Sequence, residues 1–159
     1  MRLLKGRRKY QMNSNVEIVG LILSLLNYCF VFLMIFNLLK VNYFNPIVST
    51  FVKIYKPISK ILPTLINPVI NIFVIAVGLK LLSLIVYFGS QYETITLLGV
   101  AIIQTLMVTV RIIFFAVIGG VILSWISPEK SNAFLELVVE ISYKSVSYTH
   151  LRAHETHEN

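Results

Sequence analysis

The sequence predicts an all-α membrane protein, built as a tandem repeat of a transmembrane helix, an interfacial amphipathic helix and a second transmembrane helix, with the last helix missing. Composition is the first observation behind this prediction. Hydrophobic residues make up 57% of the 159 and charged residues 13%, whereas a soluble domain has about 25% charged residues. The second observation is three long apolar runs, and the third is a polar spacing that occurs twice. These features place the chain among membrane proteins.

The three apolar runs predict three membrane-spanning helices, at 18–39, 69–88 and 97–126. A hydrocarbon core of about 30 Å takes about 20 helical residues, and each run reaches that length. The first run follows a basic leader, residues 1–15, as a secretory signal does, but it is too long for a signal core and has no small-residue cleavage site. We therefore expect it to stay in the membrane. The third run exceeds a span by about 10 residues, so it must tilt or project.

Residues 45–62 predict a helix of a different kind. Polar side chains recur at positions 49, 53, 56 and 60, which places them on one face of a helix whose other face is apolar. Helices of this type lie in the membrane interface, with their lysines among headgroup phosphates. Asn45 suits the N-cap and Pro46 the first turn, whereas Pro57 is expected to kink or split the helix. The cationic positions are Lys53, Lys56 and Lys60.

An internal repeat accounts for the order of these segments. A shift of 87 residues lays Asn132 on Asn45 and Glu140 on Lys53, so that 132–144 repeats the polar spacing of the first amphipathic segment. The spans that precede the two segments then coincide as well, which indicates a duplicated unit whose second copy stops before its last helix. The two predicted units are residues 16–96 and 97–145.

Residues 146–159 abandon the apolar pattern and hold the three histidines of the chain, His150, His154 and His157. Imidazoles with this spacing can share a helix face and bind a metal ion. The stretch VSYTHLRAHET, however, resembles the translated mosaic end and adapter of a transposon-made sequencing library. We therefore exclude this tail from the predicted fold, and we expect the native protein to be longer by at least one spanning helix.

The residues around the first amphipathic segment resemble a known family. LKVNYFNP, followed by Lys53 and Pro57, resembles the first repeat of the bacterial YggT family. Ser124 and Trp125, ahead of the second amphipathic segment, are similar to the second-repeat signature of that family. The resemblance covers about 16–144 of the chain.

The sequence departs from the YggT pattern in three places. SKILPT replaces the element that usually follows Pro57, Leu33 stands where an arginine is common, and Lys144 stands where a proline is expected. Where the motif matches, the resemblance implies contacts with the membrane surface or with a partner. The residues concerned are Phe44, Asn45, Pro46, Lys53, Lys56, Pro57, Lys60, Ser124 and Trp125.

The orientation of the chain in the membrane stays open. YggT proteins tend to start just before their first helix, which makes Met12 a candidate start. With the basic leader, the positive-inside rule favours a cytoplasmic N-terminus; without it, the lysines of residues 40–60 favour placing that segment in the cytoplasm.

Two cations lie inside predicted spans. Lys80 is near the middle of the second span and Arg111 near the middle of the third, and neither span contains an acidic residue. Each costs about 2.5 to 3.5 kcal/mol on insertion scales. Either side chain can extend along its helix to a phosphate; alternatively, it faces a partner's carboxylate, an anion or a water-filled gap. Ala116 and Gly120 form a small-xxx-small pair at which another helix can approach closely.

Chemistry at an active site is not expected. Before residue 146 there is no nucleophile motif, phosphate-binding loop or histidine, and the single cysteine, Cys29, excludes an intrachain disulfide. We therefore expect a protein that is not an enzyme and has neither cofactor nor metal. The expected partners are the bilayer with its anionic headgroups and a membrane protein or second copy, with no nucleic acid.

The resemblance implies a multi-pass protein of the bacterial inner membrane. Its relatives are linked to osmotic or potassium homeostasis, to cell division and to cytochrome assembly in plastids. The leading prediction is an assembly, scaffold or osmotic-stress accessory factor. The alternative is a transporter or channel component, in which Lys80 and Arg111 line an ion path and the repeated units form its halves.

Overall fold

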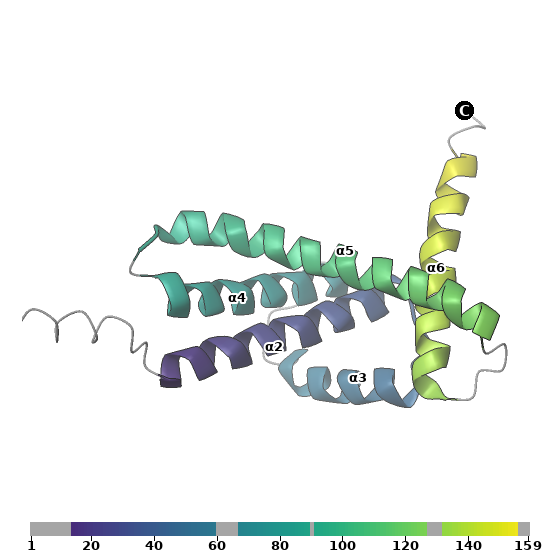
Figure 1. Ribbon diagram of the computed structural model, residues 1–159, viewed down its shortest axis with the longest axis horizontal. Helices are drawn as coiled ribbons and strands as arrows, with labels where there is room; N and C mark the ends of the chain where they lie inside the picture. Colours follow the sequence, from purple (N-terminus) through teal and green to yellow (C-terminus); the bar gives the residue numbers. More distant parts are fainter. Residues whose placement is uncertain (1–13, 60–66, 90, 127–131, 156–159) are drawn as a thin grey trace, which may run out of the picture.

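The computed structural model describes residues 14–59, 67–89, 91–126 and 132–155, and this part of the chain contains helices and no strands (Figure 1). The prediction of an all-α protein is confirmed for these residues, whereas the repeat arrangement stays a prediction. The helices are α2 Ser14–Leu38, α3 Pro46–Ser59, α4 Pro68–Phe88, α5 Thr94–Ile126 and α6 Ala133–Glu155.

Three of these helices, α2, α4 and α5, are long and apolar enough to cross a membrane. They contain 25, 21 and 33 residues, and about 20 suffice. Long apolar helices at the three predicted positions are thus confirmed, although α2 begins four residues and α5 three residues earlier than predicted. The difference arises because the first turns of both helices contain polar residues, which lie outside the apolar runs.

The helices α2 and α4 lie side by side and run in opposite directions (Figure 1). The hydroxyl of Tyr87 donates to the carbonyl of Glu17 at 3.0 Å, and the hydroxyl of Ser83 donates to the carbonyl of Gly20 at 3.0 Å. Residue numbers therefore rise along α2 as they fall along α4. Gly20 permits this close approach, because a Cβ atom there would overlap the ring of Tyr87.

A buried amide joins three helices near the middle of the bundle. Asn27, on α2, is 1% exposed, and its Nδ2 donates to the carbonyl oxygen of Ala76 on α4 at 2.8 Å and to Oγ1 of Thr105 on α5 at 3.4 Å. We call these three residues the polar junction. An unpaired amide in hydrocarbon costs several kcal/mol, so the helices are held at the depth where Asn27 finds both partners. Every buried side-chain nitrogen or oxygen among the described residues has such a partner.

The larger of two apolar core clusters lies on one side of the polar junction, along the C-terminal half of α2. Its α2 members are Phe30, Val31, Leu33, Met34, Ile35 and Phe36. Val48 of α3, Ile72 of α4 and Leu137 of α6 are buried against them. Leu33, at the position where YggT proteins have an arginine, is 2% exposed and belongs to this core. The core therefore draws α3 and α6 to the same end of the bundle.

The third span extends past the other two. Asn27 of α2 and Thr105 of α5 are in contact, so the two helices can be measured from this level. From there α2 continues for 11 residues to Leu38, whereas α5 continues for 21 residues to Ile126. At about 1.5 Å per residue, α5 reaches about 15 Å farther. The surplus length predicted for this run is therefore found as a projection beyond the end of α2.

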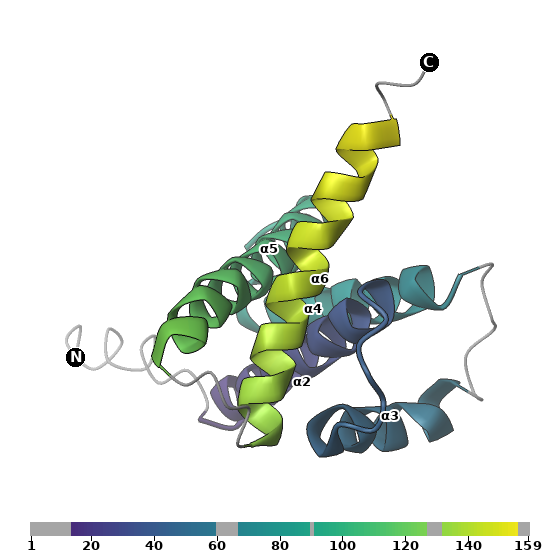
Figure 2. The same cartoon turned by 90° about the vertical axis from the view of Figure 1, so that its right-hand side faces the viewer.

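The helix α6 crosses the projecting part of α5 steeply, near the point where α3 begins (Figures 1 and 2). Small residues allow this crossing. A Cβ atom at Gly120 would overlap Cβ and Oγ of Ser142, and one at Gly119 would lie 3.3 Å from Cγ1 of Val138. The helix that approaches the pair formed by Ala116 and Gly120 is thus α6 of the same chain.

The two amphipathic segments differ from their predicted extents. The helix α3 continues through Pro57 to Ser59, so the helix is not split at this proline, and the alternative of a kink stays a prediction. Because Pro57 lies in the last turn, its missing N–H removes only one bond near the helix end. Lys60 lies outside the described residues.

The last helix runs past its predicted end at residue 144, into the tail, and stops at Glu155. Leucine, arginine, alanine and glutamate in the tail favour helix, which explains the continuation. Whether the tail derives from an adapter stays a prediction. His157 lies outside the described residues, and the residues that are described contain no group of three metal-binding side chains.

The polar junction predicts that Asn27→Leu, which keeps the size of the side chain and removes its amide, lowers the free energy of unfolding by about 1 kcal/mol. The measurement is a titration with denaturing detergent, followed by circular dichroism. Asn37→Leu is the matched control, because the Asn37 amide donates at 2.9 Å within its own helix, to the carbonyl of Leu33. Equal losses in the two variants would contradict the role given to Asn27.

The α5–α6 crossing predicts that Gly120→Ala lowers the free energy of unfolding by about 1 to 3 kcal/mol, because the new methyl group overlaps Ser142. Gly99→Ala is the control on the same helix, since a Cβ atom at Gly99 has no neighbour within 4 Å. The control is expected to be neutral or stabilising by up to about 1 kcal/mol. A Gly120 variant as stable as the Gly99 variant would count against the crossing.

Candidate functional site

The turn that follows α2 is built on a left-handed residue. Lys40 has a φ of 49°. Among the described residues other than glycine, it is the one with a positive φ. The amide of Val41 donates to the carbonyl of Phe36 at 3.0 Å, and the side chain of Val41 is 1% exposed. This is the hydrogen-bond pattern and the apolar contact of a Schellman motif, in which glycine is the usual left-handed residue. The turn sends the chain back from α2 into α3.

Asn45 caps α3 and ties it to α6. Its Oδ1 accepts from the amide of Ile47 at 3.0 Å, and its Nδ2 donates to the carbonyl of Ala133 at 2.8 Å. The side chain is 3% exposed. A carboxylate can cap a helix but has no donor, and a hydroxyl has its donor and acceptor on one atom, whereas the amide has them on two atoms and so makes both bonds at once. The predicted cap is confirmed, and the structure adds the second bond.

Asn132, the residue that the shift of 87 lays on Asn45, caps α6 in the same way. Its Oδ1 accepts from the amides of Phe134 at 3.0 Å and Leu135 at 2.9 Å. Both amphipathic helices therefore begin at an asparagine cap, and these two caps lie next to each other at one end of the bundle. This equivalence agrees with the proposed repeat at two positions; the duplication of the whole unit stays a prediction.

A charged bridge joins the turn to α6. Oε1 of Glu140 accepts from the amide of Asn42 at 2.9 Å and forms an ion pair with Nζ of Lys144 at 2.7 Å. Nζ of Lys144 also donates to the carbonyl oxygen of Lys40. Lys144, where the YggT pattern has a proline, thus serves as a link between α6 and the turn. We call α3, α6 and residues 39–45 between α2 and α3 the end platform.

The two faces of α3 meet different surroundings. The apolar face lies on α2: the ring of Phe51 is 5.7 Å from that of Phe36, and the ring of Tyr55 is 6.3 Å from that of Phe30. Burial against α2 raises the pKa of the Tyr55 phenol. The sequence predicted an apolar face among acyl chains, but much of it is occupied by α2.

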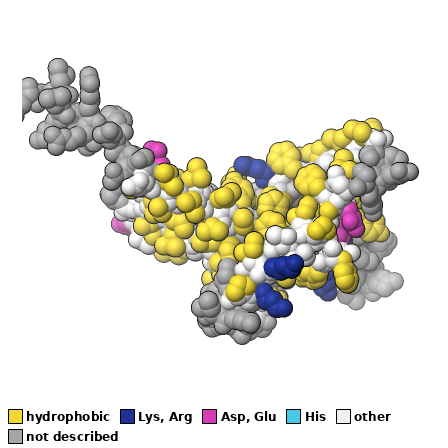
Figure 3. Space-filling model, turned by 90° about the horizontal axis from the view of Figure 1, so that it is seen from below, with side chains coloured by type: hydrophobic (Ala, Val, Ile, Leu, Met, Phe, Trp, Pro, Cys, Tyr) yellow, Lys and Arg dark blue, Asp and Glu magenta, His cyan; other side chains and the backbone are white. Residues whose placement is uncertain are grey.

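The predicted contact residues of the polar face point outward. Lys53, Lys56 and Pro57 are exposed on α3, as is Pro46 in its first turn. Seen from below, the described surface is mostly hydrophobic, and lysine and arginine atoms form a few separate patches on it (Figure 3). The lysines of α3 thus lie on the side of the helix that α2 does not cover, and a place for α3 at the membrane surface stays a prediction.

The two exposed aromatic residues of the motif lie on different segments. Phe44 is 95% exposed, in the turn before α3, and Trp125 is 85% exposed, at the end of α5. The hydroxyl of Ser124 donates to the carbonyl of Val121 at 2.7 Å within its own helix. Aromatic side chains at the ends of membrane helices commonly lie at headgroup level.

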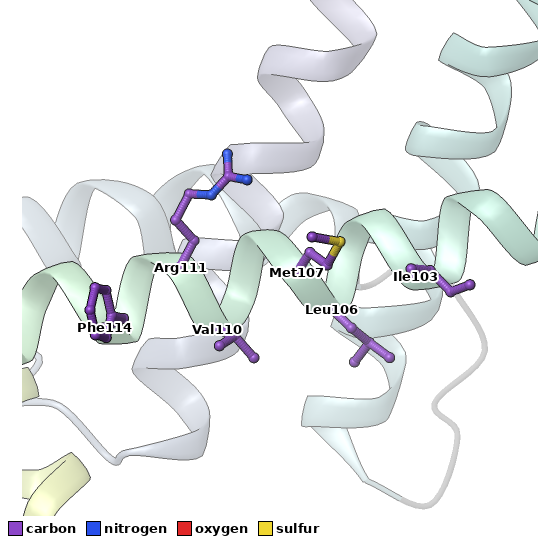
Figure 4. A pocket seen from close by; sticks show the side chains of 6 residues that line it. All are labelled: Ile103, Leu106, Met107, Val110, Arg111 and Phe114. Atoms are coloured by element: carbon purple, nitrogen blue, oxygen red, sulfur yellow. The ribbon is translucent and has the colours of Figure 1, made fainter.

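The structure does not bring the two intramembrane cations together. Lys80 is half-buried on α4, and Arg111 is exposed on α5. Arg111 lines an open groove of about 400 Å³ with Ile103, Leu106, Met107, Val110 and Phe114, all of them on α5 (Figure 4). Because no residue of α4 lines this groove, it is not a shared ion path between the two cations.

Asn27, Lys40 and Lys144 are the important residues that sequence reasoning missed. A polar residue inside an apolar span is the signal that marks Asn27. Neither partner is predictable from it, because they lie 49 and 78 residues away. Lys40 gives no signal at all, since lysine is rare at left-handed positions.

Comparisons with family models, with curated proteins and with solved structures find no match for this chain. The YggT resemblance therefore depends on the motif residues alone.

The left-handed turn predicts that Lys40→Gly is more stable than Lys40→Ala by about 1 kcal/mol, because only alanine keeps the steric cost of a positive φ. Both variants lose the same lysine side chain, and the hydrogen bond to Lys144 uses the backbone carbonyl. Detergent unfolding of the two proteins measures the difference. If the alanine variant were the more stable, Lys40 would not be left-handed in the folded protein.

Proposed function

We propose that this chain is a multi-pass scaffold of the bacterial inner membrane, of the YggT type, which serves assembly or the osmotic-stress response without being an enzyme. The observation that carries the proposal is the end platform. Two amphipathic helices are fixed to each other and to the end of the span bundle by the caps and the charged bridge. A rigid surface of this kind suits the positioning of other proteins at the membrane.

The direction of α6 supports a place for the platform in the membrane interface. It crosses the spans steeply, as a helix along the membrane surface does (Figures 1 and 2). An apolar groove of about 360 Å³ follows the crossing, and its lining includes Phe32, Phe115 and Leu137 from α2, α5 and α6. This groove suits an acyl chain of the surrounding bilayer.

The charges of the platform favour anionic headgroups as its surroundings. Lys53 and Lys56 are exposed on the face of α3 that points away from α2. A lysine near an anionic membrane surface contributes about 1 kcal/mol to its attraction. Phe44, in the turn before α3, supplies an exposed aromatic anchor. The platform therefore combines a lipid contact with a surface for partners.

A direct test compares partner binding with ion flux. In native bacterial membranes, Lys53→Glu is expected to lose membrane proteins that crosslink to the wild-type chain, because it reverses charge at the platform surface, whereas Lys53→Arg keeps them. In proteoliposomes, the wild-type chain is expected to give no more potassium flux than liposomes without protein.

The transporter alternative predicts the opposite pair of results. Potassium flux that Lys80→Leu abolishes would overturn the scaffold proposal. So would a set of crosslinked proteins that is the same in the wild type, in Lys53→Glu and in a variant with the platform broken at Glu140→Ala.

A further inference from the structure

One surface of the spans is left open to the membrane. In the most apolar 18-residue window of α5, 11% is buried, against 39% in α2 and 33% in α4. The groove around Arg111 lies on this open side and is formed by α5 alone. Lipid covers such a surface by default, because lipid tails and apolar side chains are equivalent neighbours. Arg111 is the feature that lipid tails do not explain.

The depth of Arg111 follows from the polar junction. It lies six residues beyond Thr105, which is level with Asn27, so it is about 9 Å from the middle of α2 along the bundle. Arg111 is also near the middle of α5 itself, and a cation at the centre of a membrane helix costs about 2.5 to 3.5 kcal/mol when nothing neutralises it. Figure 4 shows its guanidinium leaning toward Met107, and thus toward the middle of the bundle, rather than toward Phe114 and the platform end.

No carboxylate of the described residues neutralises Arg111. Glu17 and Glu93 lie near the ends of α2 and α5 that face away from the platform, on the far side of the polar junction. Glu136 and Glu140 lie on α6, and Glu140 is paired with Lys144.

From this combination we propose that the Arg111 groove docks a membrane-spanning helix of another protein, which carries an aspartate or glutamate at the depth of Arg111. A guanidinium binds a carboxylate through two parallel hydrogen bonds. The apolar groove receives the side chains on either side of the acid. Neutralising the cation removes the cost of burying it, so the pair fixes both the partner and its depth.

The depth of Arg111 indicates which molecule supplies the negative charge that binds it. A lipid phosphate lies at the membrane surface, near the ends of the spans, whereas Arg111 lies near the middle of α5. A second copy offers no acid at this depth, because the sequences of α4 and α5 contain none and the acid of α2, Glu17, lies in its first turn. A membrane helix of another protein meets both conditions. The inference rests on the proposed scaffold function and names the partner class for one of its surfaces.

The test is photo-crosslinking of the full chain in native bacterial membranes. A photoreactive amino acid replaces Val110, which is 66% exposed in the groove, or Val74, which is 51% exposed on α4 and serves as the matched control. We expect a protein crosslink at Val110 and none at Val74. With Arg111→Leu the yield at Val110 is expected to fall about fivefold, and with Arg111→Lys most of it is kept. Circular dichroism confirms that both variants fold.

Identification of the crosslinked peptide completes the test. The proposal expects a peptide from a spanning helix with an aspartate or glutamate, and conversion of that acid to its amide should reproduce the loss seen with Arg111→Leu. Crosslinks to lipid alone, to another copy of this chain, or to a protein whose yield is the same in Arg111→Leu would each overturn it.

A third position separates this inference from the proposed function. The photoreactive amino acid at Phe44 reports on partners of the end platform, since Phe44 is 95% exposed there. Crosslinks that persist at Phe44 while those at Val110 fail would overturn the docking groove and leave the scaffold proposal standing. Loss of protein crosslinks at both positions would overturn both.

Discussion

The fold depends on one buried amide. Asn27 lies where no water can reach it, and both of its bonds go to other helices, α4 and α5. Apolar contacts between spans are nearly as favourable to lipid as to protein, so they do not fix how far one helix slides along another. A polar side chain does fix it, because each wrong register leaves the amide without a partner in hydrocarbon.

The register then determines what happens at one end of the bundle. With Asn27 level with Thr105, α5 extends beyond α2 and carries the glycines at which α6 crosses. The turn after α2 then lies next to α6, where the amide of Asn42 donates to Glu140, the ion-pair partner of Lys144. Contacts at the surface of the protein thus depend on a hydrogen bond in its middle. The same register gives the depth of Arg111 on the open side of α5.

The sequence was informative where one segment decides its own structure. Long apolar runs predict the spans to within a few residues, and the Asn45 cap is local as well. The platform was not predictable, because it requires three segments to meet and Lys40 to adopt a conformation that lysine rarely takes. Pro57 does not split α3, because two helical residues follow it and its missing N–H affects only the last turn. The burial of Asn27 was hidden because its partners are known only once the helices are assembled.

Disulfide trapping between α2 and α4 tests the register most directly. The hydroxyl oxygens of Ser24 and Ser83 lie 2.9 Å apart, so Ser24→Cys with Ser83→Cys, in a chain with Cys29→Ala, should crosslink rapidly in membranes. Ser24→Cys with Val69→Cys should not, because Val69, which packs against the core, lies 14 residues, or about 21 Å, from Ser83 along α4. Crosslinking of the second pair as fast as the first, or of neither, would contradict the register on which the account depends.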